Sequence, residues 1–326
     1  MTGARGATPG PLRTAVIGVG HLGRHHARLL ASVPGTTFVA AADLQRERAE
    51  AAVQGTGARA VTDAAALAGE VDAVVVAVPT DQHLAVARPF LEAGVHVLVE
   101  KPIASSLDEA DELIRLAGRS GAVLAVGHTE RFNPAVQAAL PVLRTPRFVE
   151  VHRLSGFPER SLDIDVVFDV MIHDLDLMLA VDGTEVTAVE AIGVPVLTPR
   201  VDIANARLKF ASGCVANITA SRISRDKVRK VRFFQPDMYV SVDYGAQELE
   251  VWRLTPRPGG RPAIEGGPVE VAKDEPLRQE LLDFTTAIRD GRPPRVDGAA
   301  GRRALALATR VALAIEDGLR EAPPLE

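Results

Sequence analysis

The sequence predicts an α/β Rossmann domain with a doubly wound parallel sheet, followed by an α+β domain whose open, mostly antiparallel sheet carries helices on one face. Strand-like apolar runs alternate with helical segments over the first 128 residues, and a glycine-rich loop follows the first run. Long alternating runs then fill residues 147–252. The 326 residues also exceed the size, about 250–300 residues, at which single cores stop growing, so two domains are expected.

The first domain is expected over residues 1–128, with residues 1–12 as a flexible tail rich in Gly and Pro. Short buried strands are predicted at 14–18, 38–42, 71–78, 96–99 and 123–126. Helices are expected between them, and the capping-box pair Ser106 and Glu109 marks the start of one of these helices. Strands and helices that alternate in this way predict βαβ units and a parallel sheet.

The second domain is expected over residues 129–326. Alternating runs predict strands at 147–154, 186–194, 203–210, 213–222, 228–235, 238–243 and 247–252. Helices are predicted from Asn133–Pro134 and at about 165–180, 276–290 and 299–317. Gly259–Gly260 and Gly266–Gly267–Pro268 are expected to be surface turns. Long strands joined by short turns indicate an antiparallel sheet with one buried face.

The composition argues against several classes of function. A net charge of -5 offers no basic excess to neutralise nucleic-acid phosphates, and no apolar run reaches the roughly 18–20 residues that span a bilayer. The single cysteine, Cys214, excludes an internal disulfide and is expected to be a small buried hydrophobe in a reducing compartment. The chain start shows no signal-peptide pattern, so we expect a cytoplasmic protein with no nucleic-acid or membrane partner.

A glycine loop between the first strand and the first helix predicts a dinucleotide site. Gly18 allows the tight turn, Gly20 lets the backbone approach a pyrophosphate, and Gly23 lets helix and strand pack closely. His21 and Leu22 complete the loop. The pyrophosphate would then bind at the helix N-terminus, where free N–H groups and the helix dipole favour an anion.

Asp43 ends the second strand, where an acidic side chain is expected to bind the ribose hydroxyls. Its charge would repel a 2′-phosphate, so NAD is favoured over NADP. Arg46 and Arg48 follow closely and are able to accommodate a phosphate, which leaves NADP open.

Further candidate site residues follow two later strands of the predicted parallel sheet. Ligands of such sheets bind outside the carboxyl ends of the strands, and Pro79, Thr80 and Lys101 follow two such ends. Glu100 and Lys101 close an otherwise apolar run, so Lys101 is a candidate catalytic residue, the alternative being a solvated lysine before a turn. His83 is either close to the cofactor or a surface histidine at a helix start.

Three ionisable groups recur every four residues on a predicted helix that is apolar almost all round. Asp165, Asp169 and His173 are expected to share one face of this helix, which should be buried. Buried ionisable groups are costly unless they are paired or serve a site, so a functional site is predicted, with a structural Asp–His pair as the alternative. Zn or Fe ligation by the three is geometrically possible, but no metal is expected.

In order and spacing these motifs resemble the Gfo/Idh/MocA oxidoreductases. The matching segments are Gly18–His26, Ala77–His83, Glu100–Pro102 and Asp169–His173. The resemblance implies NAD-dependent oxidation of a sugar hydroxyl by hydride transfer. Lys101 and His173 would exchange the hydroxyl proton, and Asp169 would orient them. The implied cofactor contacts are Gly18, Gly20, His21, Leu22, Gly23, Asp43, Pro79, Thr80, His83, Glu100 and Lys101.

Within that family the second domain is similar to members that oxidise C3 of UDP-N-acetylglucosamine. The similar segments are Gly127–Pro134, Arg153–Ser155, Arg160–Asp165, Met171–Asp174, Arg229–Gln235 and Ser241–Tyr244. Arginine forks suit the pyrophosphate of such a substrate, although each arginine alone is more often a surface charge. The implied substrate contacts are Arg131, Asn133, Arg153, Arg160, Asp165, Asp169 and His173. The 3-keto product would lead, after amination, to a lipopolysaccharide precursor.

Other functions stay open at this point. One alternative is a relative acting on inositol, a free sugar or another UDP-sugar such as its uronic acid, and another is an NAD-binding regulator without catalysis. An open sheet with an exposed apolar face predicts a homodimer or homotetramer. The Lys101–Pro102 peptide is predicted to be cis.

Overall fold

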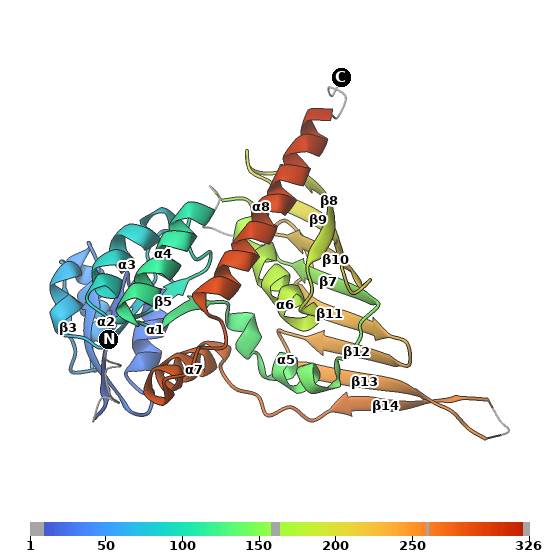
Figure 1. The fold of residues 1–326 in the computed structure, drawn as a ribbon, viewed down its shortest axis with the longest axis horizontal. Helices are drawn as coiled ribbons and strands as arrows, with labels where there is room; N and C mark the ends of the chain where they lie inside the picture. Colours follow the sequence, from blue (N-terminus) through green and yellow to red (C-terminus); the bar gives the residue numbers. More distant parts are fainter. Residues whose placement is uncertain (1–9, 158–163, 259–260, 322–326) are drawn as a thin grey trace. The chain divides into compact units, whose positions relative to one another are not determined.

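A computed structural model describes residues 10–157, 164–258 and 261–321 (Figure 1). The chain forms two compact units. The first unit comprises the residues up to Thr129 together with Glu275–Leu305, and the second comprises Glu130–Asp274 and the residues from Ala306 onward. Residues Glu275–Leu305, which the sequence assigns to the second domain, belong to the first unit.

The first unit contains a six-stranded parallel sheet with strand order β3-β2-β1-β4-β5-β6. Its strands are β1 (Leu12–Ile17), β2 (Thr36–Ala42), β3 (Arg59–Val61), β4 (Ala73–Val76), β5 (His96–Glu100) and β6 (Leu124–Gly127). Its helices are α1 (Gly23–Leu30), α2 (Arg46–Val53), α3 (His83–Glu92), α4 (Leu107–Ser120) and α7 (Pro276–Asp290), with short 3-10 turns η1 (Ala65–Gly69), η2 (Thr80–Gln82) and η3 (Thr129–Phe132). The predicted parallel sheet is confirmed. The edge strand β3, with three residues, is too short to show periodicity.

Helix α7 shows why the chain returns to the first unit. Leu281 and Phe284 of α7 are buried in the same apolar cluster as Val16 of β1 and Leu30 of α1. The helix therefore covers part of the Rossmann core, where its apolar face removes further surface from water. Periodicity predicts such a helix, but it does not show which core the apolar face meets.

The second unit is built on an eight-stranded sheet with order β14-β13-β12-β11-β7-β10-β9-β8. Only β10 and β7 pair in parallel, which confirms the prediction of a mostly antiparallel sheet. The strands are β7 (Phe148–Leu154), β8 (Val186–Val194), β9 (Ile203–Phe210), β10 (Val215–Ser221), β11 (Val228–Gln235), β12 (Met238–Asp243), β13 (Glu248–Thr255) and β14 (Ala263–Val269). Cys214 is buried directly before β10, as predicted, and burial raises the pKa of its thiol to about 11.

Strand β14 corrects one prediction. Gly266–Gly267–Pro268 form part of this strand and not a surface turn, with Gly266 opposite Trp252 and Pro268 opposite Glu250 of β13. Glycine and proline are rare within strands but are tolerated at the edge of a sheet, which is where β14 lies. Gly259 and Gly260, also predicted as a turn, lie outside the described residues.

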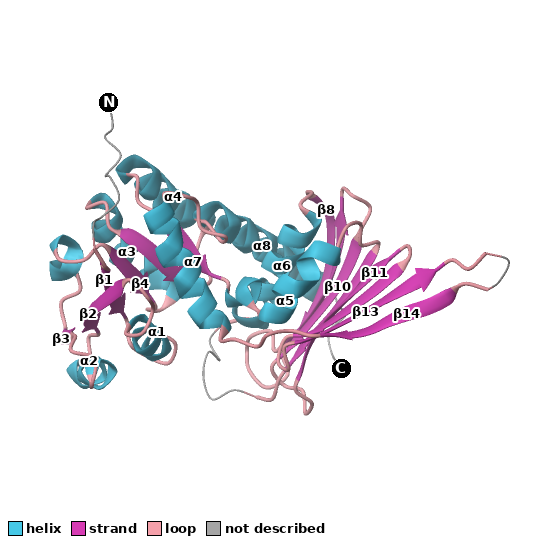
Figure 2. Ribbon diagram, turned by 90° about the horizontal axis from the view of Figure 1, so that it is seen from below, coloured by secondary structure: helices cyan, strands magenta, loops and turns pink. Residues whose placement is uncertain are grey.

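Helices of the second unit lie against one face of its sheet (Figure 2). They are α5 (Pro134–Ala139) with the 3-10 turn η4 (Leu140–Val142), the π-helical turn η5 (Val167–Met171) and α6 (Ile172–Asp182), while α8 (Gly298–Glu321) begins in the first unit and ends in the second. None of the helices in the described ranges combines the length and apolar character needed to cross a membrane.

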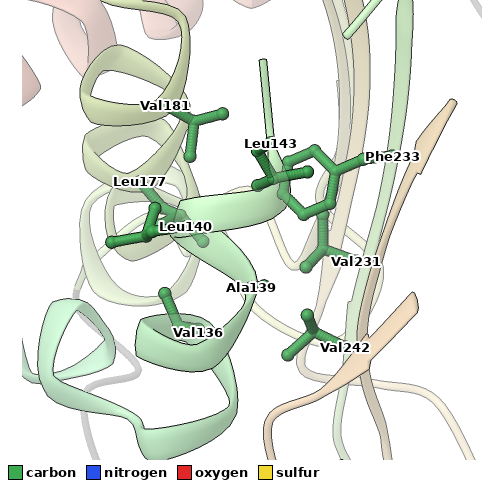
Figure 3. A pocket seen from close by; sticks show the side chains of 9 residues that line it. All are labelled: Val136, Ala139, Leu140, Leu143, Leu177, Val181, Val231, Phe233 and Val242. Atoms are coloured by element: carbon green, nitrogen blue, oxygen red, sulfur yellow. The ribbon is translucent and has the colours of Figure 1, made fainter. Parts of the chain in front are cut away.

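An apolar pocket lies between these helices and the sheet (Figure 3). It is lined by Val136, Ala139, Leu140, Leu143, Leu177, Val181, Val231, Phe233 and Val242. No polar side chain lines the pocket, so it offers nothing that would orient a sugar or a nucleotide. It is a gap in the core of the second unit.

Candidate active site

The glycine loop of the first unit has the geometry that a dinucleotide requires. Gly18 adopts φ +81°, and a Cβ there would lie 2.7 Å from the Ala77 carbonyl oxygen. A Cβ on Gly23 would lie 1.8 Å from the Gly18 carbonyl oxygen. At Gly20, by contrast, a Cβ would meet no atom within 4 Å. Packing therefore demands two of the glycines, and the third leaves open space where a pyrophosphate can approach the backbone.

Asp43 is fixed beside this loop. Its Oδ2 accepts a hydrogen bond of 3.0 Å from the Val19 N–H, and its Oδ1 accepts one of 2.9 Å from the Gln45 N–H. The carboxylate thus stands at the carboxyl end of β2 next to the loop, as predicted. Arg46 is bonded to Glu50 at 2.9 Å, so this arginine already has an anionic partner within α2.

Glu100, at the end of β5, points into the first unit. Its Oε1 lies 2.7 Å from His26 Nε2, and its Oε2 accepts from the Lys101 N–H at 3.2 Å. A Cβ at Gly127 would lie 2.9 Å from Oε2, so a larger residue there would displace this carboxylate. Burial alone raises the pKa of Glu100, but the hydrogen bond and charge of His26, with the charge of Lys101, outweigh it and lower the pKa. This carboxylate is engaged within the protein, which differs from the expected cofactor contact.

The turn that carries Lys101 is held by His83. The Lys101–Pro102 peptide is cis, as predicted. His83 Nδ1 lies 3.0 Å from the Pro102 carbonyl oxygen, and Nε2 lies 3.0 Å from the Val78 carbonyl oxygen. Burial lowers the pKa of His83. His83 is therefore not a surface histidine: its ring lies between the turn after β4 and the turn after β5, and when neutral it donates its one N–H to one of the two carbonyls.

Pro79 and Thr80 lie in that first turn, where Thr80 begins η2. Pro79 is exposed and Thr80 is half-buried. His21 and Leu22 are exposed in the glycine loop. These four residues keep the positions at the carboxyl ends of the strands that the sequence predicts.

Glu280 of α7 is a buried acid that the sequence analysis missed. It is 2% exposed. Burial, together with the nearby charge of Glu100, raises its pKa well above the ordinary value. No sequence pattern pointed to this residue, because α7 was assigned to the second domain.

The helix predicted at about 165–180 is not a single regular helix. Val167–Met171 form a π-helical turn, and the α-helical part α6 begins at Ile172. Asp169 lies in the π turn and His173 in the first turn of α6, and both are half-buried. The wider π turn changes the spacing of side chains four residues apart, so the expected single stripe is distorted. π turns are rare and occur frequently at functional sites.

Asp165 lies just before the helix and has a structural contact. Its Oδ1 accepts a 2.9 Å hydrogen bond from the Val201 N–H, and its carbonyl oxygen accepts from Phe168 and Asp169. The described residues contain no group of three His, Cys, Asp or Glu side chains placed to hold a metal ion. Asp165 therefore holds the entry of the helix, and it does not join Asp169 and His173 as a third ligand.

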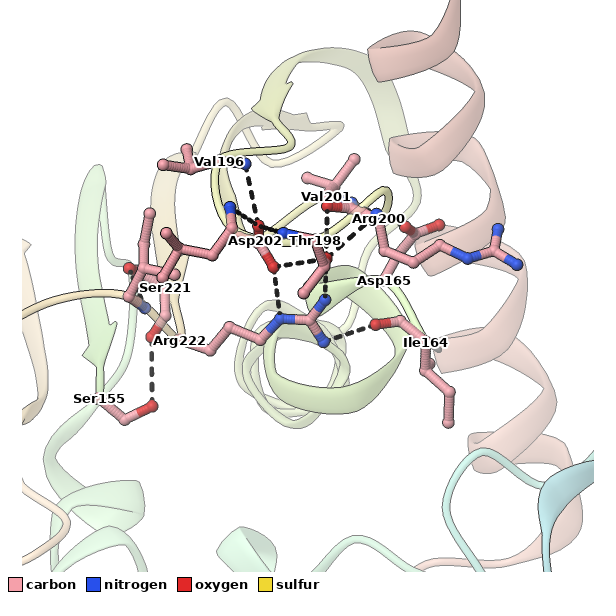
Figure 4. A network of polar contacts seen from close by, with 12 residues as sticks. Ser155, Ile164, Asp165, Val196, Thr198, Arg200, Val201, Asp202, Ser221 and Arg222 are labelled. Carbon is pink, nitrogen blue, oxygen red and sulfur yellow. Dashed lines mark hydrogen bonds and ion pairs between the residues drawn. The ribbon is translucent and has the colours of Figure 1, made fainter. Parts of the chain in front are cut away.

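A buried ion pair supports the same helix entry (Figure 4). Arg222 Nε lies 2.9 Å from Asp202 Oδ1, and Arg222 donates from Nη1 to the Ile164 carbonyl oxygen at 2.6 Å. The two side chains are 1% and 0% exposed. Burial would raise the pKa of Asp202, but hydrogen bonds from the backbone and side chain of the 196–198 segment lower it well below its ordinary value. No pattern in the sequence marks either residue.

Arg153 corrects the expected pyrophosphate site. Its guanidinium donates from Nε and Nη2 to Asp174, at 2.6 and 2.8 Å, and from Nη1 to Glu130 at 2.8 Å. It also lies over the Tyr244 ring, 4.9 Å from the centroid. Burial alone lowers the pKa of Arg153, but the two carboxylates outweigh it and raise the pKa well above its ordinary value. All three guanidinium nitrogens are bonded to carboxylates within the protein, so Arg153 is a structural residue that anchors α6 beside His173.

Arg131 and Asn133, two other predicted substrate contacts, differ in how firmly the protein itself holds their side chains. Arg131 Nη1 lies 3.4 Å from Asp176 Oδ2, a long contact. Asn133 is buried and caps α5, because its Oδ1 accepts from the Ala135 N–H at 3.1 Å. Arg160 lies outside the described residues.

Comparison with known proteins identifies the family. Residues 12–128 match the oxidoreductase family with an NAD-binding Rossmann fold, and residues 145–245 match the GFO/IDH/MocA C-terminal domain. The chain belongs to the Gfo/Idh/MocA oxidoreductases. Its first unit is accordingly an NAD-binding Rossmann domain, and the protein is an oxidoreductase.

Relatives with known names agree with this assignment. The UDP-N-acetylglucosamine 3-dehydrogenase of Acidithiobacillus ferrooxidans is 43% identical over 94% of this chain and 97% of its own length. A solved structure of that enzyme superposes with a TM-score of 0.87, covering 94% of this chain and 98% of that one. The scyllo-inositol 2-dehydrogenase of Bacillus subtilis is 29% identical, over 65% of this chain and 68% of its own. Levoglucosan dehydrogenase, solved with NADH and levoglucosan, shares the fold at 18% identity and a TM-score of 0.84 over 94% and 98% of the two chains.

Proposed function

We propose that this protein oxidises the C3 hydroxyl of UDP-N-acetylglucosamine to the 3-keto sugar, with NAD as the oxidant. The observation that carries this proposal is the 43% identity to an enzyme named for that reaction, extending over 94% of the chain and so including most of the second unit. The inositol dehydrogenase aligns with only 65% of the chain. Substrate choice in a two-unit dehydrogenase depends on the unit that does not bind the cofactor, so full-length similarity favours the nucleotide sugar.

The residues of this chain supply proton transfer. When bound, NAD accepts the hydride from the sugar carbon. Lys101 follows β5, and His173 with Asp169 lies where the π turn meets α6. We assign transfer of the substrate hydroxyl proton to Lys101 of the first unit and His173 of the second, without a choice of base between them, and assign an orienting role to Asp169. The retained Lys101, Asp169 and His173 favour an enzyme over a regulator that only binds NAD.

The first unit would hold the cofactor through the glycine loop and Asp43. The open space at Gly20 lies at the N-terminus of α1, which favours the anionic pyrophosphate. Asp43, fixed by Val19 and Gln45, would accept hydrogen bonds from the ribose hydroxyls and repel a 2′-phosphate. NAD is therefore the expected cofactor in preference to NADP.

The test is NADH absorbance when the purified protein meets NAD and each of four compounds: UDP-N-acetylglucosamine, its uronic acid, myo-inositol and glucose. The expected result is turnover with UDP-N-acetylglucosamine. NADH formation with myo-inositol or glucose and not with either UDP-sugar would overturn the substrate and leave the dehydrogenase intact. Absence of NADH with all four compounds, in a protein that binds NAD, would favour the regulator.

We also propose that the protein is a homodimer or homotetramer that covers the open face of the second sheet. Phe148 stacks on Phe234 at 5.6 Å between ring centroids, and Phe234 contacts Tyr239 at 5.3 Å. Phe234 is 36% exposed, and Ile192 of β8 is 65% exposed. Phe234→Asp should shift the mass measured by light scattering toward the monomer, and an unchanged mass would exclude this face.

A further inference from the structure

Strand β11 carries three cationic side chains, which differ in the face of the sheet on which they lie and in whether a carboxylate pairs with them. Residues along a strand alternate between the faces of the sheet. Lys230 and Arg232 lie on the open face, and each has a carboxylate partner: Asp243 at 3.3 Å and Glu150 at 2.9 Å. Arg229 lies on the other face with the buried Val231. In the part of the chain that the structure describes, no carboxylate pairs with the exposed Arg229 guanidinium.

The register places Arg229 beside the catalytic helix. Arg229 is the direct cross-strand partner of Arg153 in the β7–β11 ladder. Side chains directly opposite in such a ladder lie on the same face, with Cβ atoms about 4.5–5.5 Å apart. The Arg153 side chain reaches Asp174 of α6, the residue after His173. Arg229 therefore projects from the face that carries α6, one strand away from the anchor of that helix.

The backbone of Arg229 is fixed although its side chain is exposed. Its carbonyl oxygen accepts a 2.8 Å hydrogen bond from the Tyr244 N–H. The Tyr244 carbonyl oxygen in turn accepts a 3.0 Å hydrogen bond from the Asn133 amide, which caps α5. The position of the guanidinium is thus limited to the rotamers of a side chain on a rigid strand.

Two like charges directly opposite in a ladder are normally unfavourable. Here the charge of Arg153 is compensated by Asp174 and Glu130, which removes that penalty, whereas Arg229 has no compensating carboxylate among the described residues. A sugar nucleotide brings a diphosphate with two negative charges, and guanidinium forks bind phosphate oxygens in a bidentate manner. Arg153 is unable to do this, because its fork is already bonded.

We propose that Arg229 binds the diphosphate of the substrate and so selects nucleotide sugars over free sugars. This inference rests on the proposed function, since a diphosphate enters the site only with a nucleotide sugar. Arg229 takes the role that the sequence had led us to expect of Arg153.

The experiment compares Arg229→Gln and Arg229→Lys with Arg232→Gln, a matched control on the same strand whose arginine faces the other way. Arg229→Gln should raise KM for UDP-N-acetylglucosamine, and Ki for UDP as a competitive inhibitor, by about 10–100-fold, the range for a charged hydrogen bond. The KM and Ki values of Arg229→Lys should lie between those of Arg229→Gln and the wild type, because lysine keeps the positive charge and loses the bidentate guanidinium geometry. KM for NAD should not change in any of the variants, and Arg232→Gln should match the wild type.

Wild-type KM and Ki in Arg229→Gln would overturn the role of Arg229 and leave the proposed function standing. A wild type that oxidises only myo-inositol or glucose would overturn the proposed function. In that case calorimetry with UDP still tests Arg229: weaker UDP binding by Arg229→Gln than by the wild type supports the subsite. Equal binding, or no binding to either protein, overturns it.

Discussion

In the first unit the buried ionisable groups include histidines and glutamates (His26, His83, His128, Glu100 and Glu280), whereas in the second unit buried arginines pair with carboxylates, Arg153 with Asp174 and Arg222 with Asp202. Arginine stays protonated at any physiological pH, so the cation of each pair in the second unit does not titrate, although burial raises the pKa of the partner Asp174 above its ordinary value. Imidazole and buried carboxyl groups change protonation more readily. We therefore expect the second unit to be sensitive to loss of a partner and the first to be sensitive to pH.

The largest effect is expected at the proposed catalytic groups, one in each unit. Lys101→Ala in the first unit and His173→Ala in the second should each lower kcat by about 10²–10⁴-fold, the range for loss of a general acid–base group. Steady-state NADH formation measures this, and calorimetry should show NAD binding little changed. Lys273→Ala, at an exposed lysine, is the control. Near wild-type turnover in either variant would remove that residue from the mechanism.

A broken ion pair should give the next largest effect. Arg222→Ala leaves Asp202 buried without its cation, and loss of one partner of a buried pair costs about 3–5 kcal/mol. Urea unfolding followed by the fluorescence of Trp252, the one tryptophan of the chain, reports on the second unit. Arg207→Ala, an exposed arginine of β9, should change little. Equal midpoints for the two variants would contradict the structural importance of the pair.

Glu280 tests the pH sensitivity of the first unit. Its pKa is raised in the folded protein, so above the ordinary value of 4.5 the unfolded chain releases a proton that the folded protein keeps. The free energy of unfolding therefore falls as pH rises from 4.5 toward the folded pKa, by about 1.4 kcal/mol for each pH unit in that window. Glu280→Gln should raise Tm over the wild type more at pH 8 than at pH 5, while the exposed Glu47→Gln should not. Parallel Tm curves for Glu280→Gln and the wild type would show that burial of this acid does not destabilise the fold.

The smallest effect is expected for cofactor choice. Asp43→Asn should reduce the ratio of the NADP to the NAD dissociation constant by about 5-fold, since two unit charges 4 Å apart interact by about 1 kcal/mol in a water-like medium. Fluorescence titration of both cofactors gives the ratio. Equal ratios in the variant and the wild type would contradict the role of Asp43 in cofactor choice. Arg48 would then be the next residue to test, because Arg46 is paired with Glu50.

Features fixed by neighbouring residues were predictable from the sequence. The close approach of Gly23 to the Gly18 carbonyl, the Ser106 cap that accepts from the Glu109 N–H, and the Asn133 cap all depend on residues within a few positions of one another. Their outcomes agree with the predictions because short-range hydrogen bonds and backbone conformations decide them.

Features fixed by distant partners were not predictable in the same way. The bonds of Arg153 to Asp174 and of Arg222 to Asp202 join residues 21 and 20 positions apart. The arginine alone looks the same in sequence whether it meets a carboxylate or a substrate phosphate. Helix α7 shows the same limit, because its apolar face is visible in the sequence while the core that it joins is not.

The outer strand β14 has a consequence for how the protein behaves at high concentration. An exposed strand edge is a template onto which another chain can add, and this is a common start of fibril growth. Pro268 has no N–H to offer, and Gly266 and Gly267 have φ values of +138° and +148°, which side-chain-bearing residues rarely adopt. A foreign strand would therefore meet a missing N–H donor at Pro268 and an unusual backbone at both glycines on this edge. Gly266, Gly267 and Pro268, which made this strand look like a turn in the sequence, thus also protect the edge of the sheet from aggregation.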